Sequence, residues 1–580
     1  MDRRTIWAIL LMMAIAVTPA LFLKKPARSG EAGQRGSGAD TTLAADSAKG
    51  LQPAQEQVTL PRQDSAATAR AAPPPSGPAA PLTDIIHVTS PLYRYGVSTR
   101  GARLVQATLP RYRSMAPSDS GAPAQILPED SRLLGLTLIV GRDTVALDDW
   151  VFTASAESLT VRGPTPLQLK SSRNGIDLEL TYLFHPDDYR IDVSGHATGI
   201  SPNGGLLRIG MGPTLSNTEA DSNENHRALA LVTKHNDTER LDFGGLKLGE
   251  PKTVSGPLEW AAVKSKYFVT GVLAYDSTGG SISGVTAAAA PATGKRPTRA
   301  SVQLSLPLPP SGNFSYSVYA GPMEYDRLGR LGHGFDDVNP YGWPGFRTVI
   351  RPLAAGVRWL LVWMHEHLYL AYGLVLICFG ILVRLLLWPL NQKAMRANMQ
   401  LQAVQPLMKE IQEKYKNDPQ KVQQEMFKLY KEYGVNPLGG CWPMLLPMPV
   451  LFALFFVFQN TIELRGASFL WLPDLSRPDP LYIIPVLMGL SMFGLSKVGQ
   501  IGMEPNPQMK MMLYVMPAMM TFLFLNFASG LNLYYAVSNI ASIPQQWMLA
   551  RERQKRTARS IVEVKTRTPE PSPKRAKRKA

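Results

Sequence analysis

The feature that most constrains this 580-residue chain is a series of long apolar runs that begins after Val357. Each run approaches the roughly 20 residues with which an α-helix crosses the hydrocarbon core of a bilayer, and Pro and Gly occur inside the runs, as they do in membrane helices. The preceding sequence, up to about Gly345, is polar and rich in strand and turn residues. The two halves are therefore expected to fold in two different solvents, lipid and water.

Five apolar runs in the second half are predicted to be transmembrane helices. They are Leu368–Leu390, Met444–Thr461, Leu481–Val498, Met511–Ala528 and Leu531–Leu549. The last two are separated only by a Ser-Gly pair, so they are expected to form a tight helical hairpin. With an N-terminal apolar run, the prediction is a membrane α-helical bundle of about six helices, of which five, within residues 367–550, form the core.

The N-terminal run, Ile6–Leu23, follows Arg3 and Arg4. It is either a cleavable signal or an uncleaved anchor, and the absence of a clear small-residue cleavage motif favours an anchor over residues 1–25. Residues 26–82 are dominated by Ala, Pro, Ser, Gly and Gln. Because this composition cannot bury enough apolar surface to fold, the segment is predicted to be a disordered tether.

Residues 83–340 are predicted to form an all-β sandwich. Short alternating segments bounded by Gly, Pro, Asn or Asp are typical of antiparallel strands. Examples are Leu104–Thr108, Leu136–Val140, Ile176–Phe184, Leu206–Met211, Phe268–Ala274 and Val302–Leu306. The domain contains no cysteine and its histidines lack metal-ligand spacing, so no disulfide framework, metal or cofactor is expected.

Apolar residues recur at helical spacing between 345 and 366, with Arg351 and Arg358 on the opposite side. This pattern predicts an amphipathic helix that lies in the membrane interface. The alternative is that it is only the amphipathic start of the next transmembrane helix.

The distribution of charge predicts the orientation of the bundle. About eight Lys or Arg lie between 391 and 440, and about twelve lie in the tail 551–580, against two between Glu463 and Pro480. Since cytoplasmic loops carry the positive excess, both basic segments and both termini are expected in the cytoplasm and the β domain outside it. Residues 391–436 are predicted to form a cytoplasmic helical hairpin that restarts at Asp418 and Pro419. The tail suits anionic lipids or RNA, or serves only as an orientation signal.

Arg384 is the main candidate functional residue, because it lies inside the first of the five runs, about six residues or roughly 9 Å from its cytoplasmic end. An arginine inside the bilayer costs about 2.5 to 3.5 kcal/mol on insertion scales. Snorkelling to the interface is one explanation. An internal ion pair is another, although the neighbouring runs offer no acid. The third is a water-containing groove that attracts an acidic or polar segment of another molecule.

Several other side chains are candidates for the lining of such a groove. The polar candidates include Gln459, Asn526 and Asn532, with Asn460, Thr521, Ser538, Asn539 and Gln545. Each can instead form an ordinary hydrogen bond between helices. Methionines such as Met516 suit a surface that accepts many sequences, but they are also ordinary gap fillers.

Several motifs resemble those of the YidC/Oxa insertases. They are Arg384 followed by Trp388-Pro-Leu, the segment NPLGGCWP at Asn436–Pro443 with the preceding hairpin, and GLNLYYAVSN at Gly530–Asn539. The external part resembles the periplasmic domain of Gram-negative members, in TRGARLVQATLP (Thr99–Pro110) and YAGPMEYDRL (Tyr319–Leu328).

The resemblance implies a non-catalytic insertase and chaperone of the bacterial inner membrane. It implies a hydrophilic groove, open to cytoplasm and lipid, with Arg384 as its positive charge. Tyr535, Phe452, Phe456 and Met448 match the region that contacts substrate. The implied partners are nascent membrane proteins and the Sec translocon (SecYEG and SecDF), with the ribosome as a candidate partner of the basic tail and anionic lipids at the surface.

Three other classes of function have sequence requirements that can be compared with this chain. A proton-coupled transporter needs a titratable group deep in the bundle, and His365 and His367 lie only at the start of a run. An intramembrane protease needs paired Asp, a Ser/His pair or HExxH, and none of these occurs in the runs. A lipid scramblase or a membrane scaffold, with a β domain that binds peptide or glycan, stays open as the alternative.

Overall fold

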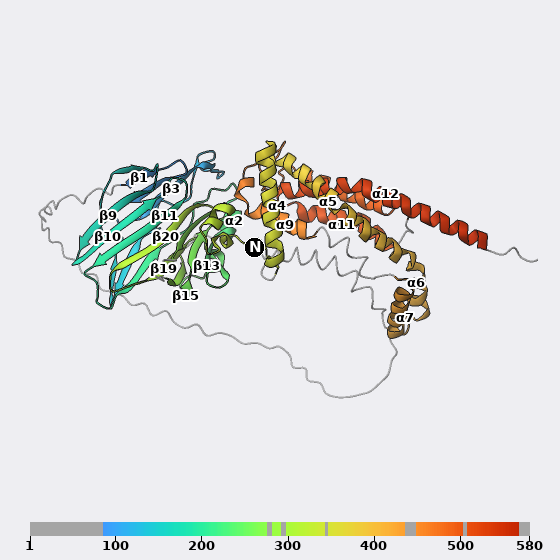
Figure 1. The fold of residues 1–580 in the computed structure, drawn as a ribbon, viewed down its shortest axis with the longest axis horizontal. Coiled ribbons are helices and arrows are strands. Elements are labelled where there is room, and N and C mark those ends of the chain that lie inside the picture. The colour runs from blue at the N-terminus through green and yellow to red at the C-terminus, as the bar shows by residue number, and fades with distance from the viewer. Residues whose placement is uncertain are drawn as a thin grey trace, which may run out of the picture. The chain divides into compact units, whose positions relative to one another are not determined.

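The computed structural model describes residues 85–274, 281–291, 297–342, 346–434, 448–502 and 507–567 (Figure 1). The predicted anchor Ile6–Leu23, the predicted tether 26–82, the motif Asn436–Pro443 and the tail beyond Arg567 lie outside the described residues.

The first described part is an antiparallel β domain with three sheets. The five-stranded sheet has the order β4-β3-β2-β1-β8, with the parallel pair β1–β8 at one edge. Its strands are β1 (Ile85–Thr89), β2 (Arg94–Ser98), β3 (Leu104–Arg113), β4 (Pro123–Gln125) and β8 (Ser158–Thr160).

The largest sheet has nine strands in the order β14-β13-β16-β17-β20-β11-β10-β9-β7. Its strands are β7 (Thr153–Ala154), β9 (Thr165–Arg173), β10 (Ile176–Phe184), β11 (Arg190–Thr198), β13 (Ala230–Lys234), β14 (Thr238–Asp242), β16 (Trp260–Lys264), β17 (Phe268–Leu273) and β20 (Asn313–Pro322). The six-stranded sheet has the order β15-β18-β19-β12-β5-β6. Its strands are β5 (Leu136–Val140), β6 (Asp143–Ala146), β12 (Gly205–Gly210), β15 (Lys252–Leu258), β18 (Ile282–Ala289) and β19 (Ala300–Leu308).

Alternation of side chains explains how these strands make a core. In β10 the residues Ile176, Leu178, Leu180, Tyr182 and Phe184 are buried, whereas the residues between them are more exposed. Successive side chains of a strand point to opposite faces, so this pattern gives β10 one apolar face. Buried residues from all three sheets join in a single apolar cluster, and the predicted β-sandwich is confirmed.

Strands β16 and β17 differ, because every residue in both is buried. One face of this pair is covered by the segment that leads from the β domain into the helices, which contains α3 (Tyr325–Arg330) and the short 3-10 helix η2 (Phe335–Val338). The Phe335 ring lies where a Cβ at Gly271 would come within 2.6 Å of it, and it packs edge-on against Trp260. This coverage on both faces explains the continuous apolar runs of β16 and β17.

The second described part is helical. Its elements are α4 (Arg347–Leu368), α5 (Tyr372–Ala403), α6 (Gln405–Lys414), α7 (Pro419–Glu432), α9 (Met448–Asn460), η4 (Ile462–Leu464), α10 (Ile483–Gly499), α11 (Pro507–Phe524) and α12 (Ser529–Arg567). Two further short helices, α2 (Ser222–Ala228) and η1 (Phe243–Gly245), belong to the β domain. Within the described residues, one stretch, Tyr372–Gln392, is long and apolar enough to cross a membrane. Three shorter apolar helices cover Met448–Asn460, Ile483–Gly499 and Met509–Phe524.

Helix ends differ from the sequence prediction at three main places. The helix α11 covers Pro507–Phe524 instead of Met511–Ala528, so residues 525–528 join the last two helices, and the predicted Ser-Gly connection lies inside α12. The helix α5 does not end at Leu390 but continues to Ala403, and the chain then restarts at α6 beside Pro406, which has no N–H to continue the helical bonding. The helix α12 likewise continues to Arg567, because the basic sequence that follows Leu549 contains helix-forming residues and no Gly or Pro before that point. The predicted cap at Asp418 is confirmed, since its side chain accepts a hydrogen bond of 3.0 Å from the Lys421 N–H.

Candidate functional site

The seam between α5 and α12 places Arg384. Gly380 lets the helices approach closely, since a Cβ there would lie 3.3 Å from a methyl of Val537. One turn further along α5, the Arg384 Nε donates to the Ser538 Oγ at 2.8 Å. Residues four apart lie on the same helix face, so Gly380 and Arg384 both face α12. Another turn on, the Gln545 amide donates to the Trp388 carbonyl at 2.9 Å.

Arg384 keeps its charge uncompensated by any carboxylate in the described part of the chain. It has no ion pair there, and its side chain is only half-buried. The phenol groups of Tyr534 and Tyr535 lie near it on the facing helix α12. A guanidinium has five N–H donors, and Ser538 accepts from the Nε–H, so the terminal nitrogens are the part of the group that a ligand can reach.

The apolar candidates lie on three helices. Tyr535 on α12 is half-buried, with its ring centroid 6.0 Å from that of Phe524 on α11. Met516 is half-buried on α11, and Met448 and Phe452 are half-buried on α9. Phe456 is 6% exposed and packs edge-on against Phe455. In this conformation a substrate would reach Phe456 only after α9 or its neighbours moved.

Three polar candidates lie towards the other end of the bundle. Gln459 is exposed at the last turn of α9, and Asn526 is exposed just after α11. Asn532 is buried and donates to the Phe524 carbonyl at 3.0 Å, which satisfies one of the last carbonyls of α11. Asn532 precedes Ser538 by six residues, or about 9 Å along α12. Arg384 therefore lies near Tyr535, whereas Gln459 and Asn526 lie towards the other end of the bundle and Asn532 lies three residues from Tyr535 on α12.

Other polar candidates make hydrogen bonds between or within helices. The Asn539 amide donates to Ser491 on α10 at 3.1 Å, and Thr521 donates to the Pro517 carbonyl of its own helix at 2.9 Å. Of the polar residues named from the sequence, Ser538 is the one that touches the Arg384 guanidinium.

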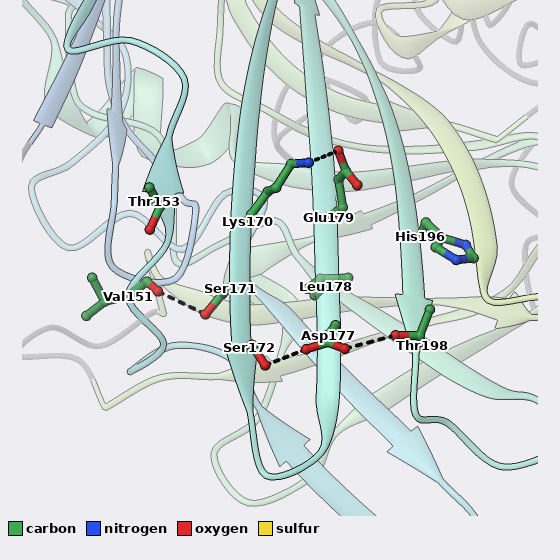
Figure 2. Close-up of a pocket in the computed structure, with 10 residues that line it drawn as sticks. All are labelled: Val151, Thr153, Lys170, Ser171, Ser172, Asp177, Leu178, Glu179, His196 and Thr198. Atoms are coloured by element: carbon green, nitrogen blue, oxygen red, sulfur yellow. Dashed lines mark hydrogen bonds and ion pairs between the residues drawn. The ribbon is translucent and has the colours of Figure 1, made fainter.

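A separate hollow of about 580 Å³ lies on the β domain, over β9, β10 and β11 (Figure 2). Its lining is mixed, and several of its polar side chains are already paired. Lys170 forms an ion pair of 2.8 Å with Glu179. The Asp177 carboxylate accepts a hydrogen bond from the Ser172 hydroxyl and another, of 3.4 Å, from the Thr198 hydroxyl. The side chains that make these contacts are largely exposed, so the hollow offers a ligand no polar group that water does not already reach.

A polar cluster around the buried Arg358 side chain was not predicted from the sequence. Arg358 on α4 contacts Asp326, which lies 32 residues before it, and Glu463, which lies 105 residues after it. No local pattern links positions so far apart, and from the sequence Arg358 was expected only on the polar side of an interfacial helix.

Two family models match the chain. The 60Kd inner membrane protein family matches residues 363–556, and the YidC periplasmic domain matches residues 85–355. Among solved structures, an active YidC insertase with its first transmembrane domain resolved is similar at 15% identity and a TM-score of 0.33, over 80% of this chain and 94% of that one.

Curated relatives named membrane protein insertase YidC are similar over most of the chain. The relative from Chlorobaculum parvum is 32% identical over 496 residues, which are 80% of this chain and 81% of the relative. The relative from Nitratidesulfovibrio vulgaris is 32% identical over 525 residues, 86% of this chain and 93% of the relative. The resemblance read from the motifs is thus confirmed, and the chain belongs to the YidC family of membrane protein insertases.

Proposed function

We propose that this protein inserts other proteins into the bacterial inner membrane and assists their folding, with Arg384 as the charge that receives the polar segment of the substrate. The proposal rests on the surroundings of Arg384. Its guanidinium is oriented by a hydrogen bond to Ser538, is half-buried among apolar helices, and has no carboxylate partner in the described residues. The insertion activity itself is inferred from the relatives that are named membrane protein insertases.

The proposed topology has α5 and α9 to α12 as the membrane helices, with the β domain in the periplasm and α6 and α7 in the cytoplasm. The positive excess between 391 and 440 supports this orientation. Exposed apolar side chains on the helices support contact with lipid, including Leu385 and Leu386 on α5, Leu490 on α10 and Phe522 on α11. In this orientation α4 lies at the periplasmic interface, with Trp359 exposed.

The proposed mechanism requires no bond to form or break. A polar or acidic segment that meets Arg384 exchanges water for a charge-assisted hydrogen bond, which contributes about 1.5 to 3 kcal/mol. This contact lowers the barrier for moving the segment across lipid, while the apolar part of the substrate leaves along α9 and α11. Tyr535, Phe452, Met448 and Met516 would line the exit, and the exposed Gln459 and Asn526 would be met near the periplasmic end, where Asn532 is buried.

Partners follow from the same proposal. Nascent membrane proteins are the substrates, and the Sec translocon, with SecYEG and SecDF, is a partner for larger ones. The basic sequence at the end of α12 and beyond suits anionic lipids or ribosomal RNA, because each positive charge near an anionic surface contributes about 1 kcal/mol.

The test uses liposomes that contain only the purified protein and a small membrane protein with an acidic translocated tail. Insertion is scored by protease protection of the tail. We expect Arg384→Ala to slow insertion about tenfold, the loss of roughly 1.4 kcal/mol, and Arg384→Lys to be milder. A substrate with a neutral tail should be unaffected. Arg142→Ala, which removes an exposed charge from the β domain, is the matched control.

Wild-type rates for both Arg384 variants on the acidic substrate would refute the role of the charge. No protection above that of empty liposomes, with the protein folded and correctly oriented, would refute autonomous insertion. The same vesicles, loaded with a fluorescent lipid, then report whether the protein moves lipid headgroups instead.

A further inference from the structure

The end of α9 that faces the β domain is bound by side chains from outside the bundle. The Asn339 Nδ2 donates to the Asn460 carbonyl at 3.3 Å, and the Asn460 Nδ2 donates to the Pro340 carbonyl at 3.1 Å. The next residue, Thr461, shares a hydrogen bond of 3.2 Å with the Tyr341 hydroxyl. These contacts satisfy a carbonyl at the end of α9, where helical bonding has ceased.

Lys264 fixes the direction of the Asn339 amide. Its Nζ donates to the Asn339 Oδ1 at 2.7 Å, and it is 3% exposed at the end of β16. Because the amide oxygen is held by this donor, the Nδ2 must face the Asn460 carbonyl. A buried lysine of the β domain therefore turns the amide nitrogen of Asn339, and not its oxygen, towards the end of α9.

Arg358 is the second link. Its side chain is 4% exposed, and it donates to the Asp326 Oδ1 at 2.5 Å and to the Glu463 Oε1 at 3.0 Å. The guanidinium also lies over the Tyr325 ring, 5.1 Å from its centroid. One residue of α4 thus ties α3 of the β domain to the turn η4 that directly follows α9.

The electrostatics of this link make it sensitive to Arg358. Burial raises the pKa of the Glu463 carboxyl above its ordinary value, and the charge of Arg358 opposes that rise. Burying a carboxylate is costly unless a cation accompanies it, and removal of one member of a buried pair leaves the other uncompensated. Without Arg358, the Glu463 carboxylate, whose side chain is only 26% exposed, would lose its cation, and η4 would be expected to shift to expose it further.

A further pair of contacts fixes α4 itself. Arg351 contacts Asp336 at 2.5 Å and Asp337 at 3.2 Å, and both aspartates lie on η2, which packs on β16 and β17. The helix α4 also packs against α9. The end of α9 is therefore held from two sides by groups that are anchored in the β domain.

We propose that Arg358 and Asn339 are positioning residues of the insertase, and that through them the β domain holds α9 at the angle at which its substrate-facing side chains meet the entering segment. The inference rests on the proposed function, since α9 carries Met448, Phe452 and Gln459. A 13-residue helix is about 20 Å long, so release of one end shifts the side chains along it by ångströms. A shift of about 1 Å is enough to weaken a positioned contact severely.

The experiment maps contacts of an arrested substrate in proteoliposomes that contain the full chain. A photo-crosslinking phenylalanine derivative is placed at Phe452 on α9 or, in a parallel preparation, at Tyr535 on α12. Arg358→Met removes the charge at similar volume, Arg358→Lys keeps the charge, and Asn339→Ala removes the amide bonds. Arg100→Met, in an exposed ion pair of the β domain, is the matched control.

We expect Arg358→Met and Asn339→Ala to lower crosslinking from position 452 about fivefold while crosslinking from position 535 changes little. Arg358→Lys should restore part of the loss. Equal loss at both positions in variants that stay monodisperse, or no loss at either, would overturn the positioning role. If Arg358→Met does not fold, the Asn339→Ala result decides.

The outcome is separable from that of the proposed function. A wild-type protein that neither inserts the substrate nor crosslinks to it refutes the insertase proposal. A wild-type protein that does both, with an unchanged crosslinking pattern in the variants, refutes only the positioning role.

Discussion

At the scale of single residues, the contact between Arg384 and Ser538 decides how the buried charge is presented. Arginine carries several rotatable bonds, and a fixed hydrogen bond to its Nε restricts them. The hydroxyl of Ser538 is neutral, so it orients the guanidinium without neutralising it. A carboxylate at the same position would compete with any acidic substrate.

The first prediction concerns Ser538. Ser538→Ala should slow insertion of a substrate with an acidic tail about threefold, since a neutral hydrogen bond contributes about 0.5 to 1.5 kcal/mol. Ser538→Thr, which retains the hydroxyl, should be closer to wild type. The measurement is the initial rate of protease protection in liposomes, with acidic and neutral tails side by side.

Ser542 supplies the control for this prediction. It lies one turn further along α12, and its hydroxyl donates to the Ser538 carbonyl of the same helix at 2.7 Å. Ser542→Ala should leave insertion of the acidic substrate unchanged. If Ser538→Ala and Ser542→Ala slow insertion equally, general packing of α12 rather than orientation of Arg384 explains the effect.

At the scale of elements, small residues set how closely the apolar helices pack. A Cβ at Gly489 of α10 would lie 1.9 Å from the Thr521 Oγ1 of α11, and that hydroxyl is already bonded to the Pro517 carbonyl. Gly494 lies on the same helix but has open space at its Cβ position. Alanine at Gly489 therefore tests the packing between α10 and α11, whereas alanine at Gly494 tests only the backbone entropy of the helix.

The second prediction uses this pair. Gly489→Ala should destabilise the protein by about 1 to 3 kcal/mol, because α10 and α11 must separate or Thr521 must turn. Gly494→Ala should stabilise it slightly, by about 0.5 to 1 kcal/mol, since alanine loses less backbone entropy in a helix. Thermal unfolding midpoints of the two variants in detergent test both signs. A fall of the same size in both midpoints would contradict the packing explanation.

Prediction of the elements from the sequence succeeded where local patterns are strong. The alternation of residues 176 to 184 and of residues 136 to 140 gives the bounds of β10 and β5 as the structure has them. The extension of α5 to Ala403 and of α12 to Arg567 was not anticipated, because a change from apolar to charged residues marks a change of solvent and not the end of a helix.

At the scale of the whole molecule, Arg465 joins the loop after η4 to the β domain. Its side chain is 3% exposed, and its Nε contacts both carboxylate oxygens of Glu219 at 3.0 Å. The terminal nitrogens donate to the carbonyls of Arg113 and Thr218, each at 2.8 Å. All these donors bind acceptors of the β domain, which makes Arg465 a structural residue.

The third prediction is that Arg465→Ala loosens this junction. Loss of one partner from a buried pair costs about 3 to 5 kcal/mol, because the Glu219 carboxylate stays buried without a cation. Hydrogen exchange should quicken in residues 461–482 and around Thr218, while β10 stays protected. Arg100→Ala, which breaks an exposed pair, should cost no more than about 1 kcal/mol. Unchanged exchange in Arg465→Ala would show that apolar contacts alone hold the junction.

By itself, the sequence determined the division into a β domain and an apolar helical part, the strand patterns, the cap at Asp418 and the presence of a charge, Arg384, among apolar residues. These are properties of neighbouring residues, and periodicity and composition report them directly. The tertiary structure alone decided which polar groups meet. Ser538 lies 154 positions from Arg384, and Glu219 lies 246 positions from Arg465. Such pairs form only when distant segments pack, because the free energy that selects them comes from burial and from satisfying hydrogen bonds, and neither depends on separation along the chain.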